Sequence, residues 1–321
     1  LSGNYAFHLM AYRRELLLEL GGLRPEFDGS QDYDLLLRAA ETHPVVRHIP
    51  AVLYHWRQHE TSVAHSDDAK SYAFEAGTRA LNQALSRRGL AAEALEIDDL
   101  WRGMHVIRWR PVRAAEITVV QVQSGDTGSY RAAFENHDLE TPYLAVLAST
   151  LTELAPDALT GLCAWLTVPG VGLASGKLLD SEGHIEYAGM VYQDGSPIIP
   201  YRGYPESEAG YLAMTRIVHN ISAPHPYCVL IHRELWRRLN GLDCRYTGPY
   251  ALLDFALRAL DSGWRAVVDP QYRWRMPSSL PIAAGEDLSL FGRRWRKRLA
   301  EGDRYGNPNW RVTDSGVRLS E

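Results

Sequence analysis

The chain has 321 residues, 45% of them hydrophobic, and a formal net charge of −5. This length suits about two domains, and so modest a charge gives no sign of the overall basic character of a nucleic-acid-binding protein. No apolar run reaches the ~20 residues of a membrane-spanning helix.

The ends and the cysteines give further expectations. The chain starts at Leu1 without a basic or apolar leader, so we expect no signal peptide and a chain cut from a longer protein. Cys163, Cys228 and Cys244 show no metal-ligand spacing. We therefore expect reduced, unreactive thiols in a cytoplasmic protein.

One segment of the chain occurs twice. Residues 12–38 read YRRELLLELGGLRPEFDGSQDYDLLLR, and residues 231–258 read IHRELWRRLNGLDCRYTGPYALLDFALR. After a slip of one residue, Asp34 and Arg38 fall on Asp254 and Arg258. The offset of 219 or 220 residues is about that of one whole domain.

Both copies predict the same local structure. A first helix ends at Gly22 or Gly241, where glycine can adopt the left-handed conformation of a helix C-terminus. A turn leads to a second amphipathic helix and then to a strand, over residues 48–57 or 266–275.

Four further segments have regular patterns. Residues 67–89 predict a linker helix packed on the first unit, and residues 117–122 and 144–147 predict strands on either side of a helix over 130–137. A turn at 169–172 leads into another strand. Residues 289–300 predict a closing helix whose basic stretch, 291–298, is either a solvated face or a patch for acidic lipid or a partner.

These motifs resemble family 2 glycosyltransferases of the GT-A fold, especially bacterial enzymes with two such domains in one chain. The resemblance rests on GSQDYDL (29–35), IPAVLYHWRQHETS (49–62), PGVGLASGKLLDSEGHIEYAGMVY (169–192) and YGNPN (305–309). It implies an α/β fold with a mixed sheet flanked by helices. The expected parts are the C-terminal portion of a GT-A domain (1–66), a linker (67–99), a shortened GT-A-like domain (100–310) and a tail (311–321).

The resemblance also implies site residues in the first unit. Asp32, at the start of a helix, takes the place of the general base, and a plain helix-capping carboxylate is the alternative. Arg57 would face the donor diphosphate and His59 would be a metal ligand. The intact family enzyme uses Mg²⁺ or Mn²⁺, a nucleotide sugar and a saccharide acceptor. The metal carboxylates and the donor-base pocket are missing from this copy, so we expect no metal bound by this chain.

The second unit departs from the family pattern at each catalytic position. Ser149 and Thr150 follow the strand where metal carboxylates are expected, and hydroxyls are poor substitutes for them. Leu252, or Ala251 on the other side of the slip, stands in the place of Asp32, and Pro277 stands in the place of His59. We interpret this unit as a degenerate, pseudo-transferase domain.

A metal site in the second unit is a weaker alternative. The candidates His184, Glu186, His219 and His225 lack the spacing of zinc motifs, so scattered surface histidines are favoured.

Three functions therefore stay open. The first is transfer of a sugar in bacterial surface-glycan assembly, in the cytoplasm and peripheral to the inner membrane. The others are a non-catalytic module that binds acceptor glycan or a protein partner, and a sugar-binding protein that uses the Tyr- and Trp-rich second unit.

Overall fold

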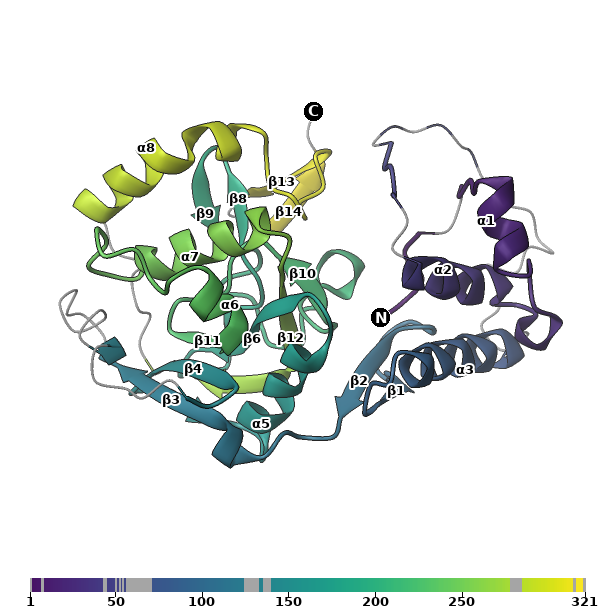
Figure 1. The fold of residues 1–321 in the computed structure, drawn as a ribbon, viewed down its shortest axis with the longest axis horizontal. Coiled ribbons are helices and arrows are strands. Elements are labelled where there is room, and N and C mark those ends of the chain that lie inside the picture. Colours follow the sequence, from purple (N-terminus) through teal and green to yellow (C-terminus); the bar gives the residue numbers. More distant parts are fainter. Residues whose placement is uncertain are drawn as a thin grey trace. The chain divides into compact units, whose positions relative to one another are not determined.

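The computed structural model describes residues 2–6, 9–42, 45–49, 51, 53, 55, 71–123, 133–134, 140–277, 285–313 and 316–319. The chain divides into two compact units, with the boundary between Trp109 and Arg110, and each unit has its own core (Figure 1). Residues 100–109 belong to the first unit, whereas the domain bounds expected from the sequence place them in the second domain, at 100–310.

The first unit is mainly helical. Helix α1 (Arg14–Glu19) and a 3-10 turn, η1 (Pro25–Phe27), lead into α2 (Gln31–Glu41), which packs against the long helix α3 (Ser71–Arg87). The face of α3 in the core is rich in small residues, which let the neighbouring helix approach closely. Its fully buried members are Ala76, Ala80, Leu81, Ala84 and Leu85.

A hairpin follows α3 and completes the unit. Strands β1 (Ala92–Glu96) and β2 (His105–Trp109) pair antiparallel. The Asn82 amide of α3 bonds both backbone groups of Ala94, accepting from its N–H at 2.8 Å and donating to its carbonyl at 3.1 Å. This hairpin occupies part of the segment expected as linker, because pairing and the Asn82 contact outweigh the helix preference of AEALE.

The second unit contains an eight-stranded mixed sheet. Its main path is β10 (His219–Ile221), β12 (Arg265–Arg275), β6 (Val171–Leu179), β11 (Cys228–His232), β4 (Tyr143–Ala148) and β3 (Ile117–Val122). The short strands β5 (Thr152–Glu153) and β7 (Ile185–Tyr187) pair with β12 and β6. The pairs β3–β4 and β6–β12 are parallel and the others antiparallel. The strands predicted at 117–122 and 144–147 are confirmed.

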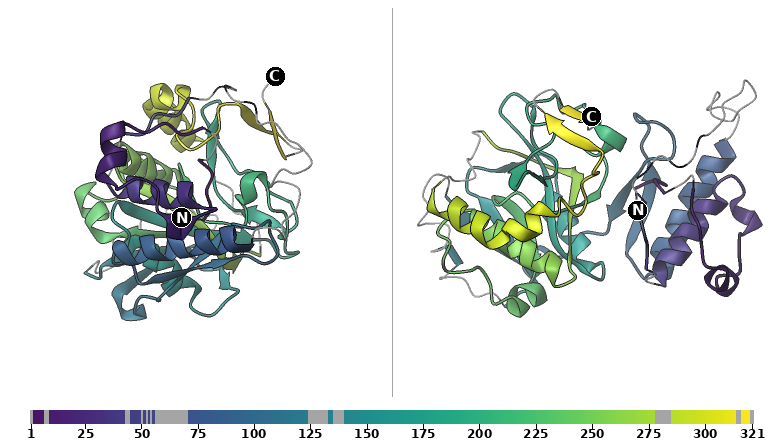
Figure 2. Two further views of the ribbon diagram at one scale, coloured as in Figure 1. Left: turned by 90° about the vertical axis from the view of Figure 1, so that its right-hand side faces the viewer. Right: turned by 90° about the horizontal axis from the view of Figure 1, so that it is seen from above.

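Helices and two hairpins surround this sheet. Helix α7 (Tyr250–Asp261) packs against β12, and α8 (Glu286–Ala300) packs on α7, so that α7 lies between the sheet and α8 (Figures 1 and 2). The short helices are α5 (Ala158–Cys163), with the 3-10 turn η5 (Ala164–Thr167), and α6 (Arg233–Arg238). The hairpins are β8 (Val191–Gln193) with β9 (Ser196–Ile198) and β13 (Trp310–Thr313) with β14 (Gly316–Leu319). Two further 3-10 turns are η4 (Ala114–Glu116) and η6 (Tyr211–Ala213).

The centre of the sheet is closely packed. All nine residues of β6 are buried, and a Cβ added to Gly176 would lie 2.1 Å from the Trp274 ring. Only glycine fits there, since the indole of β12 occupies the space of a side chain. The expected α/β fold with a mixed sheet and flanking helices is confirmed in this unit.

The two copies of the repeat agree in their helices and differ in their strand. The glycines that end the first helix are left-handed as predicted, with φ of 71° at Gly22 and 65° at Gly241. The strand predicted at 266–275 lies in β12, but residues 45–49, 51, 53 and 55 of the first copy form none. That prediction is wrong for these residues. β12 pairs with β6 and β10, whereas the strands described in the first unit pair only with each other.

Candidate functional site

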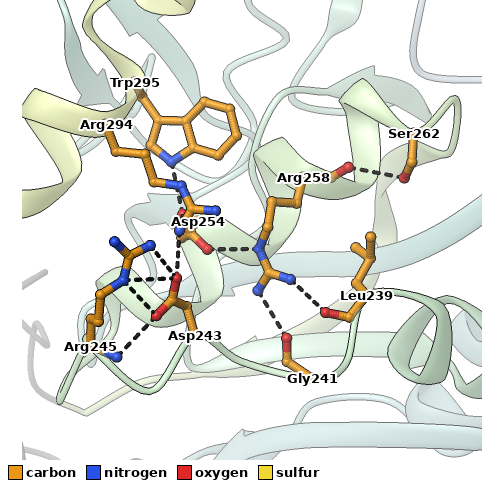
Figure 3. A network of polar contacts seen from close by, with 9 residues as sticks. All are labelled: Leu239, Gly241, Asp243, Arg245, Asp254, Arg258, Ser262, Arg294 and Trp295. Atoms are coloured by element: carbon orange, nitrogen blue, oxygen red, sulfur yellow. Dashed lines mark hydrogen bonds and ion pairs between the residues drawn. The ribbon is translucent and has the colours of Figure 1, made fainter.

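A polar network joins the two helices of the second copy (Figure 3). The Arg258 guanidinium of α7 donates to Asp254 Oδ2 at 2.8 Å and to the carbonyls of Leu239 and Gly241 at 2.8 and 2.9 Å. Those carbonyls lie where α6 ends and have no partner within the helix. Arg258 therefore caps one helix while it pairs with a fully buried carboxylate on the other.

The first copy repeats this arrangement atom for atom. Arg38 Nε donates to Asp34 Oδ2 at 2.9 Å, and its two terminal nitrogens donate to the carbonyls of Leu20 and Gly22 at 2.5 and 2.7 Å. We call the Asp34–Arg38 and Asp254–Arg258 pairs, with their two carbonyls each, the helix clamps. Equal partners at equal spacing indicate one duplicated structural unit.

The clamps fix the register that the sequence left open. Counted back from the clamp aspartates, Asp32 of α2 corresponds to Leu252 of α7. Helix α7 has one more residue at its start, so Ala251 corresponds to Asp32 when counting from the first residue of each helix. Leu252 and Ala251 are 0% and 3% exposed, so either count replaces the carboxylate by an apolar core residue.

Asp32 lies at the second position of α2 and is half-buried. Its Oδ2 accepts a hydrogen bond from Asn4 Nδ2 at 3.0 Å, and its Oδ1 accepts from the backbone N–H of Tyr33 at 2.8 Å. The second bond satisfies a first-turn N–H, as expected of a helix-terminal carboxylate. The first holds the carboxylate in one orientation while part of it stays accessible.

Asp34 points into the core instead, as its position round the helix from Asp32 predicts. It accepts hydrogen bonds from Arg24 and Arg38. Burial raises the pKa of Asp34, but the hydrogen bonds from Arg24 and Arg38 outweigh burial and set it below its usual value. Asp34 is therefore a structural anion, and of the two acids only Asp32 can meet a substrate.

The other candidates of the first unit, Arg57 and His59, lie outside the described residues. The structure brings together Asp32 and Asn4, and it leaves the proposed diphosphate and metal contacts untested.

In the second unit, Ser149 and Thr150 directly follow β4 and are both exposed. The backbone N–H of Ser149 donates to the Val122 carbonyl at 3.0 Å, so this turn is anchored to the end of β3. Ser149 and Thr150 present only neutral hydroxyls at this strand end, and these do not fit a divalent cation.

Pro277 lies just beyond β12 and is exposed. Its neighbour Met276 is fully buried, and its backbone N–H donates to the Leu179 carbonyl at 2.7 Å. Since proline has no side-chain donor atom, Pro277 supplies no metal ligand at the position that the sequence repeat aligns with His59.

The four residues of the alternative metal site have separate partners. Glu186 forms two hydrogen bonds with Arg202, at 2.6 and 3.1 Å, and His184 lies near Asp180 and Glu182. Burial lowers the pKa of His219 to about 4 and that of His225 to about 3. Among the described residues no three His, Cys, Asp or Glu side chains form a group that could hold a metal ion.

The basic helix α8 divides into structural and exposed cations. Arg294 pairs with Asp243 at 2.5 Å and with Asp254 at 3.1 Å, and Arg298 lies 3.5 Å from Asp261 (Figure 3 shows Arg294). The remaining cations of the 291–298 stretch are exposed: Arg293, Arg296 and Lys297. Part of the basic stretch 291–298 therefore stabilises the fold.

No helix in the described part of the chain is long and apolar enough to cross a membrane.

Two groups of residues were missed from sequence. Asn4 is a single amide 28 residues before Asp32, and nothing in its surroundings distinguishes it. The Tyr211 and Trp310 rings lie 6.1 Å apart although about a hundred residues separate them. The YGNPN motif at 305–309, next to Trp310, was the one available signal.

No protein-family model matches the chain. The chain is 28% identical over 329 aligned positions to an uncharacterised protein of Sinorhizobium fredii, covering 83% of this chain and 36% of that protein. It is 27% identical over 384 positions to an O-antigen biosynthesis protein of Myxococcus xanthus, covering 99% of this chain and 30% of that protein. The chain thus spans about a third of the length of these curated relatives.

Among solved structures, the chain is similar to a mannosyltransferase of Pyrobaculum calidifontis in complex with GDP-mannose and Mn²⁺. The TM-score is 0.30 at 16% identity, over 50% of this chain and 38% of that one.

Proposed function

We propose that the chain is part of a glycosyltransferase that moves a sugar from a nucleotide-sugar donor to a saccharide acceptor in bacterial surface-glycan assembly. In this proposal Asp32 is the general base, the first unit is a portion of a family 2 GT-A domain, and the second unit is a non-catalytic, shortened copy of that domain. The similarity to an O-antigen biosynthesis protein over 99% of the chain supports the general role.

One observation carries the division of labour between the units. The helix clamps make Asp32 and Leu252 equivalent, and the first is a half-buried carboxylate whereas the second is a fully buried leucine. A leucine takes no proton from an acceptor hydroxyl. If one copy performs general-base catalysis, it is the copy that contains Asp32.

The contacts of Asp32 suit a base. An acceptor hydroxyl would bond to a carboxylate oxygen before losing its proton, which requires an oriented carboxylate with a free lone pair. Asn4 and the Tyr33 N–H take one position on each oxygen and leave the others available. Arg57 for the donor diphosphate and His59 as a metal ligand complete the proposal on resemblance alone.

The metal step is confined to the first unit. A divalent cation would stabilise the leaving diphosphate. The exposed hydroxyls at Ser149 and Thr150 do not fit such an ion, so we assign no step to the second unit. The cytoplasmic location and the peripheral membrane contact through α8 stay predictions.

The test compares the rate of sugar transfer between single-substitution variants of the full-length natural protein. Asp32→Asn keeps the size and one acceptor oxygen but not the basicity, so transfer should fall by about 10²-fold or more. Ser149→Ala and Thr150→Ala change exposed hydroxyls of the second unit and should leave the rate unchanged. Loss of transfer in the latter pair together with full activity in Asp32→Asn would reverse the assignment.

A further inference from the structure

The most exposed large apolar residues described in the second unit lie together in one turn. Tyr211 and Leu212, in η6 (Tyr211–Ala213), are 43% and 52% exposed. The backbone of Leu212 and Ala213 is left-handed, with φ of 49° and 57°. Such a conformation is strained for a non-glycine residue and persists where its surroundings impose it.

Well-defined hydrogen bonds impose this conformation. The Tyr211 N–H donates to the Tyr201 hydroxyl at 2.8 Å, and the Gly210 N–H donates to Glu208 Oε1 at 2.9 Å. The Met214 N–H closes the turn on the Tyr211 carbonyl at 3.1 Å. The fold therefore holds an aromatic side chain at the surface although its exposure adds nothing to the core.

A second aromatic side chain faces this turn from the C-terminal part of the chain. Trp310 begins β13, and its ring centroid lies 6.1 Å from that of Tyr211 with 52° between the planes. Asn307 Nδ2 donates to the Tyr211 hydroxyl at 3.5 Å, and Asn307 Oδ1 accepts from the Asn309 N–H at 2.9 Å. Two tilted rings and an amide thus meet at one place.

This C-terminal segment is anchored in turn. Asp303 Oδ1 accepts from the N–H groups of Tyr305 and Gly306, both at 2.8 Å, and Asp303 Oδ2 accepts from the Tyr192 N–H of β8 at 2.8 Å. The Gln193 amide bonds both backbone groups of Val312 in β13. The hairpin β13–β14, yellow in Figure 2, is therefore fixed to the body of the second unit.

The chemistry of this surface suits a sugar ring. A pyranose has an apolar face of C–H groups and a rim of hydroxyls, so it stacks on aromatic rings and bonds to amides and phenols at their edge. Arg311, the neighbour of Trp310 in the chain, pairs with Asp194. The positive charge next to Trp310 is therefore balanced, which suits a neutral saccharide.

We propose that Tyr211, Trp310 and Asn307 form a saccharide-binding surface that holds the acceptor glycan on the second unit. This inference rests on the proposed function, because a glycan-assembly protein supplies the reason to hold a saccharide. It gives the second unit a role that needs neither metal nor base.

The experiment measures binding to the isolated chain by saturation-transfer NMR and tryptophan fluorescence. The probes are neutral gluco-, manno- and galacto-oligosaccharides of four to six pyranose units. We expect low-millimolar binding of at least one probe, weakened about tenfold or more by Tyr211→Ala and by Trp310→Ala. Tyr211→Phe keeps the ring and should weaken binding only about threefold.

Trp101→Ala is the matched control, since Trp101 is an exposed aromatic residue of the first unit at 47% exposure. It should bind as the unaltered chain does, and far-UV circular dichroism checks that the hairpin survives Trp310→Ala. The proposal would be overturned if no probe bound, or if Tyr211→Ala and Trp310→Ala bound the probe as tightly as the unaltered chain does. Neither result bears on Asp32, whose role is read from transfer rates and not from saccharide affinity.

Discussion

The Arg258 guanidinium donates over 2.8 Å to Oδ2 of Asp254, which lies one turn earlier in α7. The same contact between Arg38 and Asp34 measures 2.9 Å in the first unit. The two terminal nitrogens of each arginine donate to two backbone carbonyls at the C-terminal end of the preceding helix. One arginine therefore fixes the angle between two helices, which explains why both residues recur when the surface around them has changed.

The clamps should dominate the stability of their helix pairs. Asp254→Ala leaves the Arg258 charge largely buried without its partner and should lower the free energy of unfolding by about 3–5 kcal/mol. Asp34→Ala should act similarly in the first unit. Urea unfolding followed by circular dichroism measures both.

Asp194→Asn is the control for these variants, because asparagine tolerates the left-handed backbone of this position, at φ of 52°. It removes the charged partner of Arg311 in a pair whose side chains are 69% and 51% exposed, so its effect should stay below about 1 kcal/mol. Equal losses for Asp194→Asn and Asp254→Ala would show that the clamp pairs contribute no more than an exposed ion pair.

Much of the second unit could be predicted because its patterns are local. The alternation in ITVVQV predicts β3 with its observed bounds, and the left-handed glycines follow from helix-ending chemistry. The β1–β2 hairpin could not be predicted, because AEALE has the composition of a helix and its strand conformation depends on pairing with HVIRW.

The candidate site was predictable only in part, for a related reason. Asp32 has a helix start and a repeat to identify it, whereas its orienting partner Asn4 is recognised only once the chain has folded. Leu252 was one of two possible counterparts of Asp32, and the choice required the clamp geometry rather than the letters of the sequence.

Two buried groups should give the second unit opposite responses to acid. Burial lowers the pKa of His225 to about 3, so between pH 6 and 4 only the unfolded chain protonates it, and stability falls as pH falls. Burial raises the pKa of Asp269 to about 6, so in the same range only the folded chain protonates it, and stability rises as pH falls. The two effects oppose each other.

Single variants should separate these effects. His225→Gln should make the dependence of unfolding free energy on pH less positive by about 1.4 kcal/mol per pH unit, and Asp269→Asn should make it more positive by about the same amount. Urea unfolding at several values between pH 4 and 6 measures the slopes. Slope changes of the same sign would contradict the assignment of either proton.

Asn4 should position the Asp32 carboxylate in the transfer reaction. Asn4→Asp places a second carboxylate where an amide now donates to Asp32 Oδ2 at 3.0 Å, and like charges raise the pKa of the pair. The acidic limb of the kcat/KM profile should move to higher pH, while Asn4→Ala, which adds no charge, should lower kcat by about tenfold.

Gln121→Glu is the control, because it adds the same charge at an exposed position of β3 in the other unit. A profile that moves equally in Asn4→Asp and Gln121→Glu would point to net charge. One that does not move in Asn4→Asp would remove Asn4 from the site.

The last prediction exchanges the two residues that the clamps make equivalent. Asp32→Leu removes two hydrogen bonds from a half-buried position, so the free energy of unfolding should fall by only about 1–2 kcal/mol while transfer is lost.

Leu252→Asp inserts a carboxyl at a position with 0% exposure. It leaves the void of the leucine side chain and buries a polar group without a partner, so it should cost more than about 3 kcal/mol and gain no activity. Leu252→Ala, with the void alone, is the reference for the polar contribution. Urea unfolding and transfer assays on the three variants decide the matter: a stable Leu252→Asp protein with new transfer activity would mean that the second unit has kept its catalytic cleft and lacks only its base.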